Sequence, residues 1–572
     1  MTNKEIKMSI IPEVKNRFLY DKTVDLNKIK WSFNDKADKR VVVEAYRIRE
    51  NCENGFPVYI NMGNKYCEEY TIEIEDDKAE ILSDGANGAF YALQTLKRLL
   101  GEHGGIVYCQ KICDKPDMKY RGLYHDVSRG KIPTLETLKE LVDTIAYYKM
   151  NSLQLYIEHT FEFKEYEFCR EKLGYLTKDE IKQLDAYCKS KFIDLIPSIS
   201  TFGHLYHLLA EGKYKHLSEL PDYVPQSHYW LERLLHHTIN PTNDESFEVI
   251  KSLIDQYLEC SSSDTFNICC DETFDLGTGV NKGKDKAKLY VDFVSKIAEY
   301  LNQKGKTVMM WGDIILQHPE YIDKLPNNII FLNWCYAKDP QIDNFEKMSQ
   351  SGKRQIVCPG TSSWDTFSED IITEEGNISK LAEYGYRFNA DGLLITNWGD
   401  HGNIASITAA MYGIVLSAAI AWNKKIIADK DFRTEVSTQI YGNSETVEIV
   451  AKISDIKNVF SWRKVIEGYA DEKSKKPYDD YADAIHKMDS ICAEIKNLAF
   501  SDETIKREMI CAAEGFLIVI YLCARIDGYN IKCDVNFKKW LDEYSELWLV
   551  RSKPSELSEV INILNGAWYK SL

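Results

Sequence analysis

Short apolar runs alternate with longer amphipathic segments from about residue 119 to residue 422. An apolar run of about four to eight residues predicts a buried strand, and the amphipathic segment after it predicts a helix that covers the sheet. Eight such βα units follow one another, which predicts a closed (β/α)8 barrel (TIM barrel), an α/β fold, rather than an open sheet. The predicted strands are Tyr120–Asp126, Ser152–Ile157, Phe192–Ser200, Thr265–Asp271, Thr307–Gly312, Asn328–Trp334, Gln355–Pro359 and Gly392–Trp398.

The residues before the barrel show a different pattern. Tyr70–Ile74 alternates between apolar and polar positions, as a half-buried strand does, whereas Gly88–Leu100 places leucines at helical spacing. These features predict a small α/β domain over residues 1–115, followed by the barrel over residues 116–424.

The residues after the barrel lose the strand pattern. Ile485, Met488, Ile491 and Ile495 fall on one helical face, which predicts an all-helical domain over residues 425–572. Met509–Ile526 is apolar on most sides but carries two charged residues. We therefore expect a buried or interface helix with no membrane partner, and its apolar surface also allows a homodimer.

Composition narrows the class of protein. The net charge is -17 without a long acidic run, so the chain lacks the basic footprint of a nucleic-acid-binding protein. The first residues contain no apolar secretory core, and the 15 cysteines show no zinc-ligand spacing. We therefore expect a cytoplasmic protein with reduced thiols and neither metal nor organic cofactor.

Polar and aromatic residues gather where the predicted strands end, which is where barrel enzymes hold their reacting groups. Indoles can cover the apolar face of a sugar ring while carboxylates bind its hydroxyls, so this mixture predicts a carbohydrate site. The candidates are Glu158, His159, His204, Asp271, Glu272, Trp311, Trp334, Tyr336, Trp364, Asp365, Trp398 and Asp400.

The sharpest of these features is the adjacent pair Asp271 and Glu272 after the apolar run Phe266–Cys270. Two acids are costly to place at the end of a buried strand, and a positioned carboxyl can serve as a general acid. Cys269 and Cys270 precede the pair, and a nucleophilic thiol is an alternative, but no activating base is evident nearby in the sequence. The better interpretation is that both cysteines are small side chains that pack in the buried core.

Three motifs resemble glycoside hydrolase family 20, the β-N-acetylhexosaminidases, over the first three quarters of the chain. They are Asp84–Leu96 before the barrel, Tyr120–Arg129 at its first strand, and the Asp271–Glu272 pair. The resemblance implies a retaining exo-β-N-acetylhexosaminidase that removes terminal β-linked GlcNAc from oligosaccharides or glycoconjugates, with GalNAc as a second candidate sugar. In such enzymes the substrate's own acetamide oxygen attacks the anomeric carbon, so no enzyme carboxylate forms a covalent bond to the sugar.

The resemblance also implies roles for single residues. Glu272 would be the general acid and base, and Asp271 would polarise the acetamide. Arg121 and Asp400 would bind sugar hydroxyls, and His204, with Glu158 or His159, would tune the acid. Trp311, Trp334 and Trp398 would enclose the sugar and its acetamido group, beside Trp364 and Asp365 after the seventh strand.

The chain departs from the family in three places, one of which is the loop after the third strand, where Ser200 and Phe202 replace an acid and a proline. The family commonly has paired glycines where this chain has Cys269 and Cys270, and it has a tyrosine near the seventh strand where this chain has Gly360–Asp365. Tyr336 is the substitute candidate for holding the acetamide oxygen. Two other functions stay open: a catalytically silent carbohydrate-binding barrel, and a glycosidase that acts only on a longer acetamido-glycan.

Overall fold

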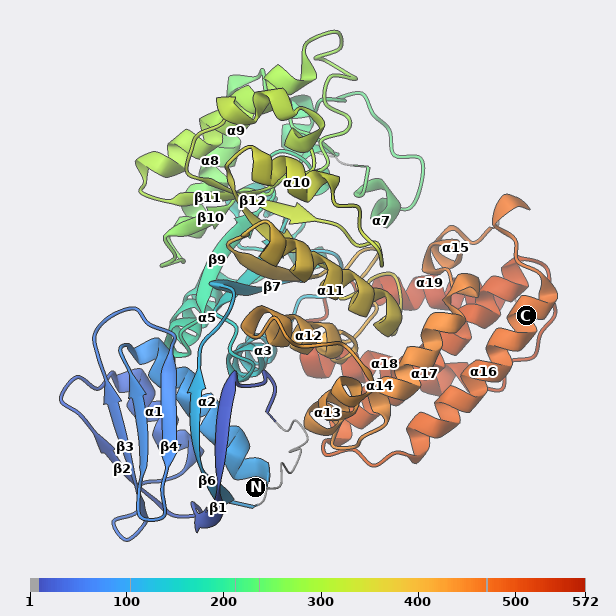
Figure 1. The fold of residues 1–572 in the computed structure, drawn as a ribbon. Helices are drawn as coiled ribbons and strands as arrows, with labels where there is room; N and C mark the ends of the chain where they lie inside the picture. Colours follow the sequence, from blue (N-terminus) through green and yellow to red (C-terminus); the bar gives the residue numbers. More distant parts are fainter. Residues whose placement is uncertain (1–9, 103, 211, 236, 470–471, 571–572) are drawn as a thin grey trace.

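The computed structural model describes residues 10–570 apart from residues 103, 211, 236 and 470–471. A closed parallel barrel forms its centre, with a sheet domain and a bundle of helices packed against it at separate places (Figure 1). The predicted (β/α)8 barrel with its two flanking domains is confirmed.

The N-terminal domain is a six-stranded sheet in the order β1-β6-β4-β5-β3-β2. Helix α2 covers this sheet with a buried face of leucine and aromatic side chains. The elements are β1 (Asn16–Asp25), β2 (Ile29–Phe33), α1 (Lys39–Ile48), β3 (Phe56–Met62), β4 (Tyr70–Ile74), β5 (Ala79–Ser83), α2 (Ala86–Glu102) and β6 (Ile106–Asp114).

The barrel closes when β14 pairs with β7 and β9 pairs with β10, all in parallel. Its strands are β7 (Tyr120–Asp126), β8 (Ser152–Ile157), β9 (Asp194–Ile199), β10 (Thr265–Asn267), β11 (Thr307–Trp311), β12 (Ile329–Trp334), β13 (Arg354–Cys358) and β14 (Gly392–Asn397). The helices around it are α3 (Leu135–Tyr147), α5 (Lys178–Ser190), α8 (Asp244–Leu258), α9 (Lys286–Gln303), α10 (Asp343–Gln350), α11 (Ile371–Arg387) and α12 (Met411–Trp422).

The strand β10 is shorter than the sequence predicts. It ends at Asn267 rather than Asp271, because Cys269 and Cys270 have φ angles of 56° and 64°. These left-handed conformations break the extended backbone that a strand requires. Glycine adopts them at little cost, which explains why a pair of glycines suits this position.

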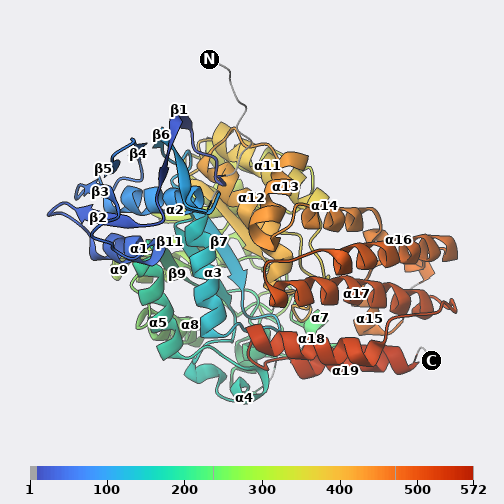
Figure 2. The same ribbon diagram turned by 90° about the horizontal axis from the view of Figure 1, so that it is seen from below.

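The C-terminal region is helical (Figure 2). Its helices are α13 (Lys430–Tyr441), α14 (Thr446–Ala451), α15 (Trp462–Glu467), α16 (Tyr478–Asn497), α17 (Glu503–Ile526), α18 (Phe537–Arg551) and α19 (Leu557–Lys570). Helix α17 is long and apolar enough to cross a membrane by composition, but 72% of its most apolar window is buried. It serves as the central helix of this bundle.

Candidate active site

The segment that follows β10 presents the two adjacent carboxylates. Three of its residues, Cys269, Cys270 and Glu272, have left-handed backbones, and the last has a φ of 51°. Tyr290 donates a hydrogen bond of 2.8 Å to the Cys270 carbonyl and so holds the irregular segment. Asp271 is buried, whereas the side chain of Glu272 is partly exposed, as a group that meets a substrate must be.

His204 joins the two acids. Its Nε2 lies 3.3 Å from Oδ2 of Asp271 and 3.3 Å from Oε2 of Glu272. Burial alone would lower the pKa of this imidazole, but the charge of Asp271 and hydrogen bonds to both acids outweigh burial and raise it to about 10. His204 is therefore a buried cation at neutral pH that fixes the spacing of the two carboxylates.

Asp313 is a third acid in this cluster, and the sequence-based set of site residues omits it. Its Oδ2 accepts a hydrogen bond of 3.0 Å from the backbone N–H of Glu272. Burial, together with the charge of Asp271, raises the pKa of Asp313 above its usual range. The position of Asp313 two residues after β11, in the motif that begins at Trp311, is the signal that could have identified it.

Aromatic side chains from several strands form one wall of the site. Trp311 and Trp398 each lie with their ring centroids 5.1 Å from that of Tyr124. Trp311 is fully buried behind the others, so it supports the wall. The structure thus brings together two of the predicted indoles inside the carboxyl-terminal end of the barrel.

The outer part of this wall is formed by partly exposed rings. Trp334 stacks on Tyr336 at 5.0 Å with an interplanar angle of 17°, and Trp364 meets Tyr336 at 5.1 Å. The hydroxyl of Tyr336 accepts a hydrogen bond of 2.7 Å from Nε1 of Trp398, which orients it. These three rings have the exposed surface that a sugar ring or an acetamido methyl needs.

A second charged cluster surrounds Arg129, just after β7. Its Nη1 lies 2.7 Å from Oδ1 of Asp400 and 3.5 Å from Oδ2 of Asp126, and its Nε lies 3.4 Å from Oε1 of Glu158. The guanidinium also lies over the ring of Trp398, 5.1 Å from its centroid. Glu158 and Asp400 are therefore neighbours through an arginine that the sequence-based set did not include.

Arg121 is not part of this cluster, and its predicted role in binding sugar hydroxyls is wrong. It is the second residue of β7, at the amino-terminal end of the barrel, and only 1% of its surface is exposed. Its guanidinium forms a two-pronged ion pair with Glu68 of the N-terminal domain at 2.8 and 3.1 Å. Its Nε donates to the Lys149 carbonyl, so Arg121 joins two domains and contacts no surface of the site.

The remaining predicted residues lie at the edge of the site. Asp365 pairs with His401, whose Nδ1 is 2.6 Å from its Oδ1. His159 is buried against His207, with ring centroids 4.2 Å apart, and burial lowers its pKa well below the usual range. The structure thus places His159 in a neighbouring polar cluster rather than on the wall formed by the tryptophans.

Cys269 lies inside the barrel, close to the hydroxyls of Tyr124 and Ser198. Burial raises the pKa of this thiol to about 12, so it stays protonated and weakly nucleophilic. Cys270 is likewise buried with a raised pKa. Cys269 therefore packs inside the barrel and Cys270 in the surrounding core, and both are small buried side chains, as the sequence favours.

Two groups of histidine and acidic side chains within the described ranges approach one another closely enough to share a metal ion. The first is His204 with Asp271 and Glu272, where the protonated imidazole has no lone pair for a metal. The second is His159 and His207 with Glu556. Glu556 already accepts hydrogen bonds from Trp230 and Tyr229 and faces Arg233, so a cation would meet a positive neighbour there.

Comparison with known proteins agrees with this geometry. Residues 118–392 match the family model for the catalytic domain of glycosyl hydrolase family 20. A β-hexosaminidase of Akkermansia muciniphila is 34% identical over 156 residues, or 24% of this chain and 31% of the relative. A β-hexosaminidase of Vibrio vulnificus is 23% identical over 46% of this chain and 39% of the relative. The chain thus spans less than half the length of either relative.

The fold is shared with solved structures. A β-N-acetylhexosaminidase from Bacteroides fragilis aligns over 75% of this chain and 94% of its own, with a TM-score of 0.63 and 19% identity. A chitobiase from Flavobacterium johnsoniae aligns over 96% of this chain and 100% of its own, with a TM-score of 0.64 and 16% identity. The barrel, its carboxylate cluster and these similarities are those of a glycoside hydrolase catalytic domain of the (β/α)8 class. Within that class, residues 118–392 are similar to the catalytic domain of glycosyl hydrolase family 20.

Proposed function

We propose that this chain is a retaining exo-β-N-acetylhexosaminidase that removes a terminal β-linked N-acetylglucosamine by substrate-assisted catalysis. The observation that carries the proposal is the cluster of His204, Asp271 and Glu272 at the open end of the barrel, beside a wall of partly exposed aromatic rings. Such a cluster offers one carboxyl for the leaving group and a second for the acetamide.

Each acid has a distinct task in the proposed reaction. Glu272, the more exposed of the two, gives its proton to the glycosidic oxygen and then takes one from the attacking water. Asp271 stabilises the positive charge that develops on the acetamide nitrogen as the acetamide oxygen attacks the anomeric carbon. His204 keeps the two carboxylates at fixed positions, so little reorganisation is needed during the reaction.

The other side chains bind the sugar. Asp400 is paired with Arg129 and keeps part of its side chain exposed, so it can accept hydrogen bonds from sugar hydroxyls. Tyr336, oriented by Trp398, is the group that we propose donates to the acetamide oxygen. Trp334 and Trp364 would cover the acetamido methyl and the sugar face.

The proposed setting is the cytoplasm, and the proposed substrates are short oligosaccharides with a terminal N-acetylhexosamine. All fifteen cysteines are free thiols in the structure, which supports a reducing compartment. Fractionation of the source cells tests the location. A homodimer through the apolar C-terminal helices remains a proposal that sedimentation of the purified protein tests.

Hydrolysis of p-nitrophenyl β-N-acetylglucosaminide, the matching galactosaminide and the non-acetylated glucoside tests the activity. Release from the acetamido substrates but not from the glucoside is the expected result, because only the former carry the internal nucleophile. Silence on all three by folded protein would contradict the proposal. Binding of N-acetylglucosamine without hydrolysis would then favour the silent barrel, and cleavage of a chitin oligosaccharide alone would favour an enzyme for longer glycans.

A further inference from the structure

The loop after β14 has an unusual backbone directly beside Asp400. Three consecutive residues, His401, Gly402 and Asn403, have φ angles of 42°, 98° and 49°. Side chains other than glycine rarely adopt the left-handed region, and such a backbone persists only where its surroundings hold it. The position of Asp400 therefore depends on groups outside the loop.

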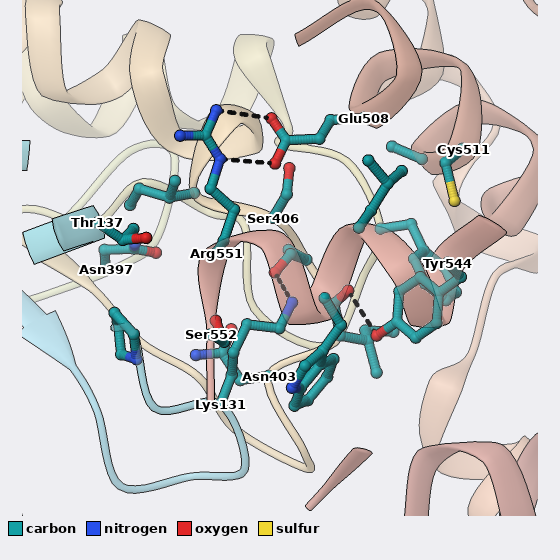
Figure 3. Close-up of a pocket in the computed structure, with 18 of the residues that line it drawn as sticks. Lys131, Thr137, Asn397, Asn403, Ser406, Glu508, Cys511, Tyr544, Arg551 and Ser552 are labelled. Atoms are coloured by element: carbon teal, nitrogen blue, oxygen red, sulfur yellow. Dashed lines mark hydrogen bonds and ion pairs between the residues drawn. The ribbon is translucent and has the colours of Figure 1, made fainter. Parts of the chain in front are cut away.

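Two of these groups belong to the C-terminal helical domain. Nε1 of Trp462, at the start of α15, donates a hydrogen bond of 2.8 Å to the His401 carbonyl. The hydroxyl of Tyr544, in α18, donates one of 3.1 Å to the Ile404 carbonyl (Figure 3). Both side chains are buried, so water does not compete for these bonds.

The same domain holds the loop that carries Arg129. The backbone N–H of Glu556 donates to the Gly130 carbonyl at 3.2 Å, and that of Lys553 donates to the Ile132 carbonyl at 2.8 Å. In return, the N–H of Thr134 donates to the Arg551 carbonyl at 3.0 Å. Residues 551–556 thus run beside the loop after β7 much as an added strand would.

The two loops meet with little free space. A Cβ atom on Gly130 would lie 2.5 Å from the Gly402 carbonyl oxygen, and one on Gly402 would lie 2.4 Å from the ring of Trp230. The indole N–H of Trp230 in turn donates to the carboxylate of Glu556. The loops after β7 and β14, the indole of Trp230 and the C-terminal domain therefore form one close-packed junction next to the Arg129–Asp400 pair.

Beside this junction, a cavity of about 60 Å³ separates the barrel from the C-terminal domain. Lys131, Asn403, Ser406 and Tyr544 lie around it, as Figure 3 shows. Lys131, in the loop after β7, donates a hydrogen bond of 2.6 Å to the Ala405 carbonyl in the loop after β14. Around this cavity, hydrogen bonds therefore add to the support that residues 401–405 receive from the buried side chain of Ile404 and the ion pair of His401 with Asp365.

We propose that Trp462 and Tyr544 are positioning residues for sugar recognition, through which the C-terminal helical domain completes the active site. They hold residues 401–403 in the left-handed conformation and thereby keep Asp400 against Arg129. This inference rests on the proposed hexosaminidase function only in its kinetic readout. The dependence of the loop after β14 on the C-terminal domain does not depend on which substrate the protein binds.

The test uses Tyr544→Phe and Trp462→Phe in the full chain, each of which removes one hydrogen bond and keeps an aromatic ring. Tyr529→Phe is the matched control, because Tyr529 lies in the same domain and packs on Tyr481. We expect each positioning variant to raise KM for the p-nitrophenyl substrate by roughly threefold to tenfold, with kcat changed less than twofold. The control should change neither.

Amide hydrogen exchange of residues 398–407 provides the second readout. We expect faster exchange in both positioning variants than in wild type or Tyr529→Phe, whether or not the substrate is hydrolysed. Unchanged KM and unchanged exchange in folded variants would overturn the proposal, and so would a fall in kcat with KM unchanged. Silence of the wild type on every glycoside would count against the hydrolase function alone, and exchange would still decide this inference.

Discussion

The two ends of β7 each carry a buried arginine paired with carboxylates, yet they serve different purposes. Arg121, at the amino-terminal end, joins the barrel to Glu68 of the N-terminal domain. Arg129, beyond the carboxyl-terminal end, bridges Asp400 and Glu158 in the candidate active site. Burial and ion pairing are alike in the two, so neither property identifies a binding residue.

What separates them is the end of the barrel on which they lie. In (β/α)8 proteins, the loops after the strands build the site, whereas the opposite end contributes stability. A change at Arg121 should therefore alter folding and spare turnover, and a change near Arg129 should do the reverse. Substitutions at the two ends of the barrel test that division.

Glu272→Gln should have the largest effect, because it removes the proposed acid from the carboxyl-terminal end. We expect kcat to fall by about a hundredfold to ten-thousandfold on chitobiose, whose leaving group needs protonation. The loss on p-nitrophenyl N-acetylglucosaminide should be smaller, because nitrophenolate leaves without help. Steady-state rates on the two substrates measure the difference, and equal losses would remove Glu272 from the acid role.

Arg121→Met should destabilise the fold and leave catalysis intact. Removing one partner of a buried ion pair costs about 3–5 kcal/mol, because Glu68 is left as an unpaired buried charge. Urea denaturation measures this loss, and the double variant with Glu68→Leu should recover much of it. A large fall in kcat/KM per folded molecule would contradict the assignment of Arg121 to the domain junction.

Arg129→Lys should weaken catalysis with a smaller change in stability. Lysine keeps the positive charge but cannot contact Asp400 and Glu158 with separate nitrogen atoms of one rigid fork. We expect kcat/KM to fall by about tenfold to a hundredfold. If kcat/KM instead equals that of wild type while the free energy of unfolding drops as in Arg121→Met, the two arginines are not functionally distinct.

Stability should depend on pH through His204. The folded pKa of about 10 lies above the ordinary value of 6.5, so this contribution is complete below 6.5 and is lost as the pH rises through 10. Between about pH 7 and about pH 9, the free energy of unfolding should fall by about 2 kcal/mol from this group. His204→Asn should remove that slope, and an unchanged slope in the variant would show that the imidazole is not a cation at neutral pH.

Cys269→Ala should have the smallest effect. The thiol is protonated by virtue of its raised pKa, so its loss should change kcat by less than about threefold and cost about 1 kcal/mol of stability for the cavity left. Rates and thermal unfolding measure both. A loss of turnover comparable with that of Glu272→Gln would instead support Cys269 as a nucleophile.

Much of the barrel could be predicted from the sequence, because continuous apolar runs between amphipathic helices have few alternative folds. The bounds of β7 and β8 coincide with the predicted ones. The end of β10 could not be predicted, because Cys269 and Cys270 adopt a conformation that their side chains do not favour. In the sequence, only the family's preference for glycines at these two positions indicates the left-handed backbone.

The error at Arg121 has a physical cause visible in the strand period. Successive side chains of a strand point to opposite faces, so Arg121 shares a face with Leu123 rather than with Tyr124, which lies inside the barrel. The partner Glu68 lies 53 residues earlier and carries no local signal. The support given by Trp462 and Tyr544 was equally hidden, because hydrogen bonds between distant segments leave no sequence pattern.

In the proposed reaction, the substrate's acetamide supplies the nucleophile while Asp271 and Glu272 assist it. The most direct test is hydrolysis, by the wild-type protein, of aryl β-glucosaminides whose N-acetyl group carries none, one, two or three fluorine atoms. Fluorine withdraws electrons from the carbonyl oxygen, so we expect a steep fall in kcat/KM with each substitution. Equal kcat/KM values across the series would show that the acetamide oxygen does not attack the anomeric carbon and would contradict substrate-assisted catalysis.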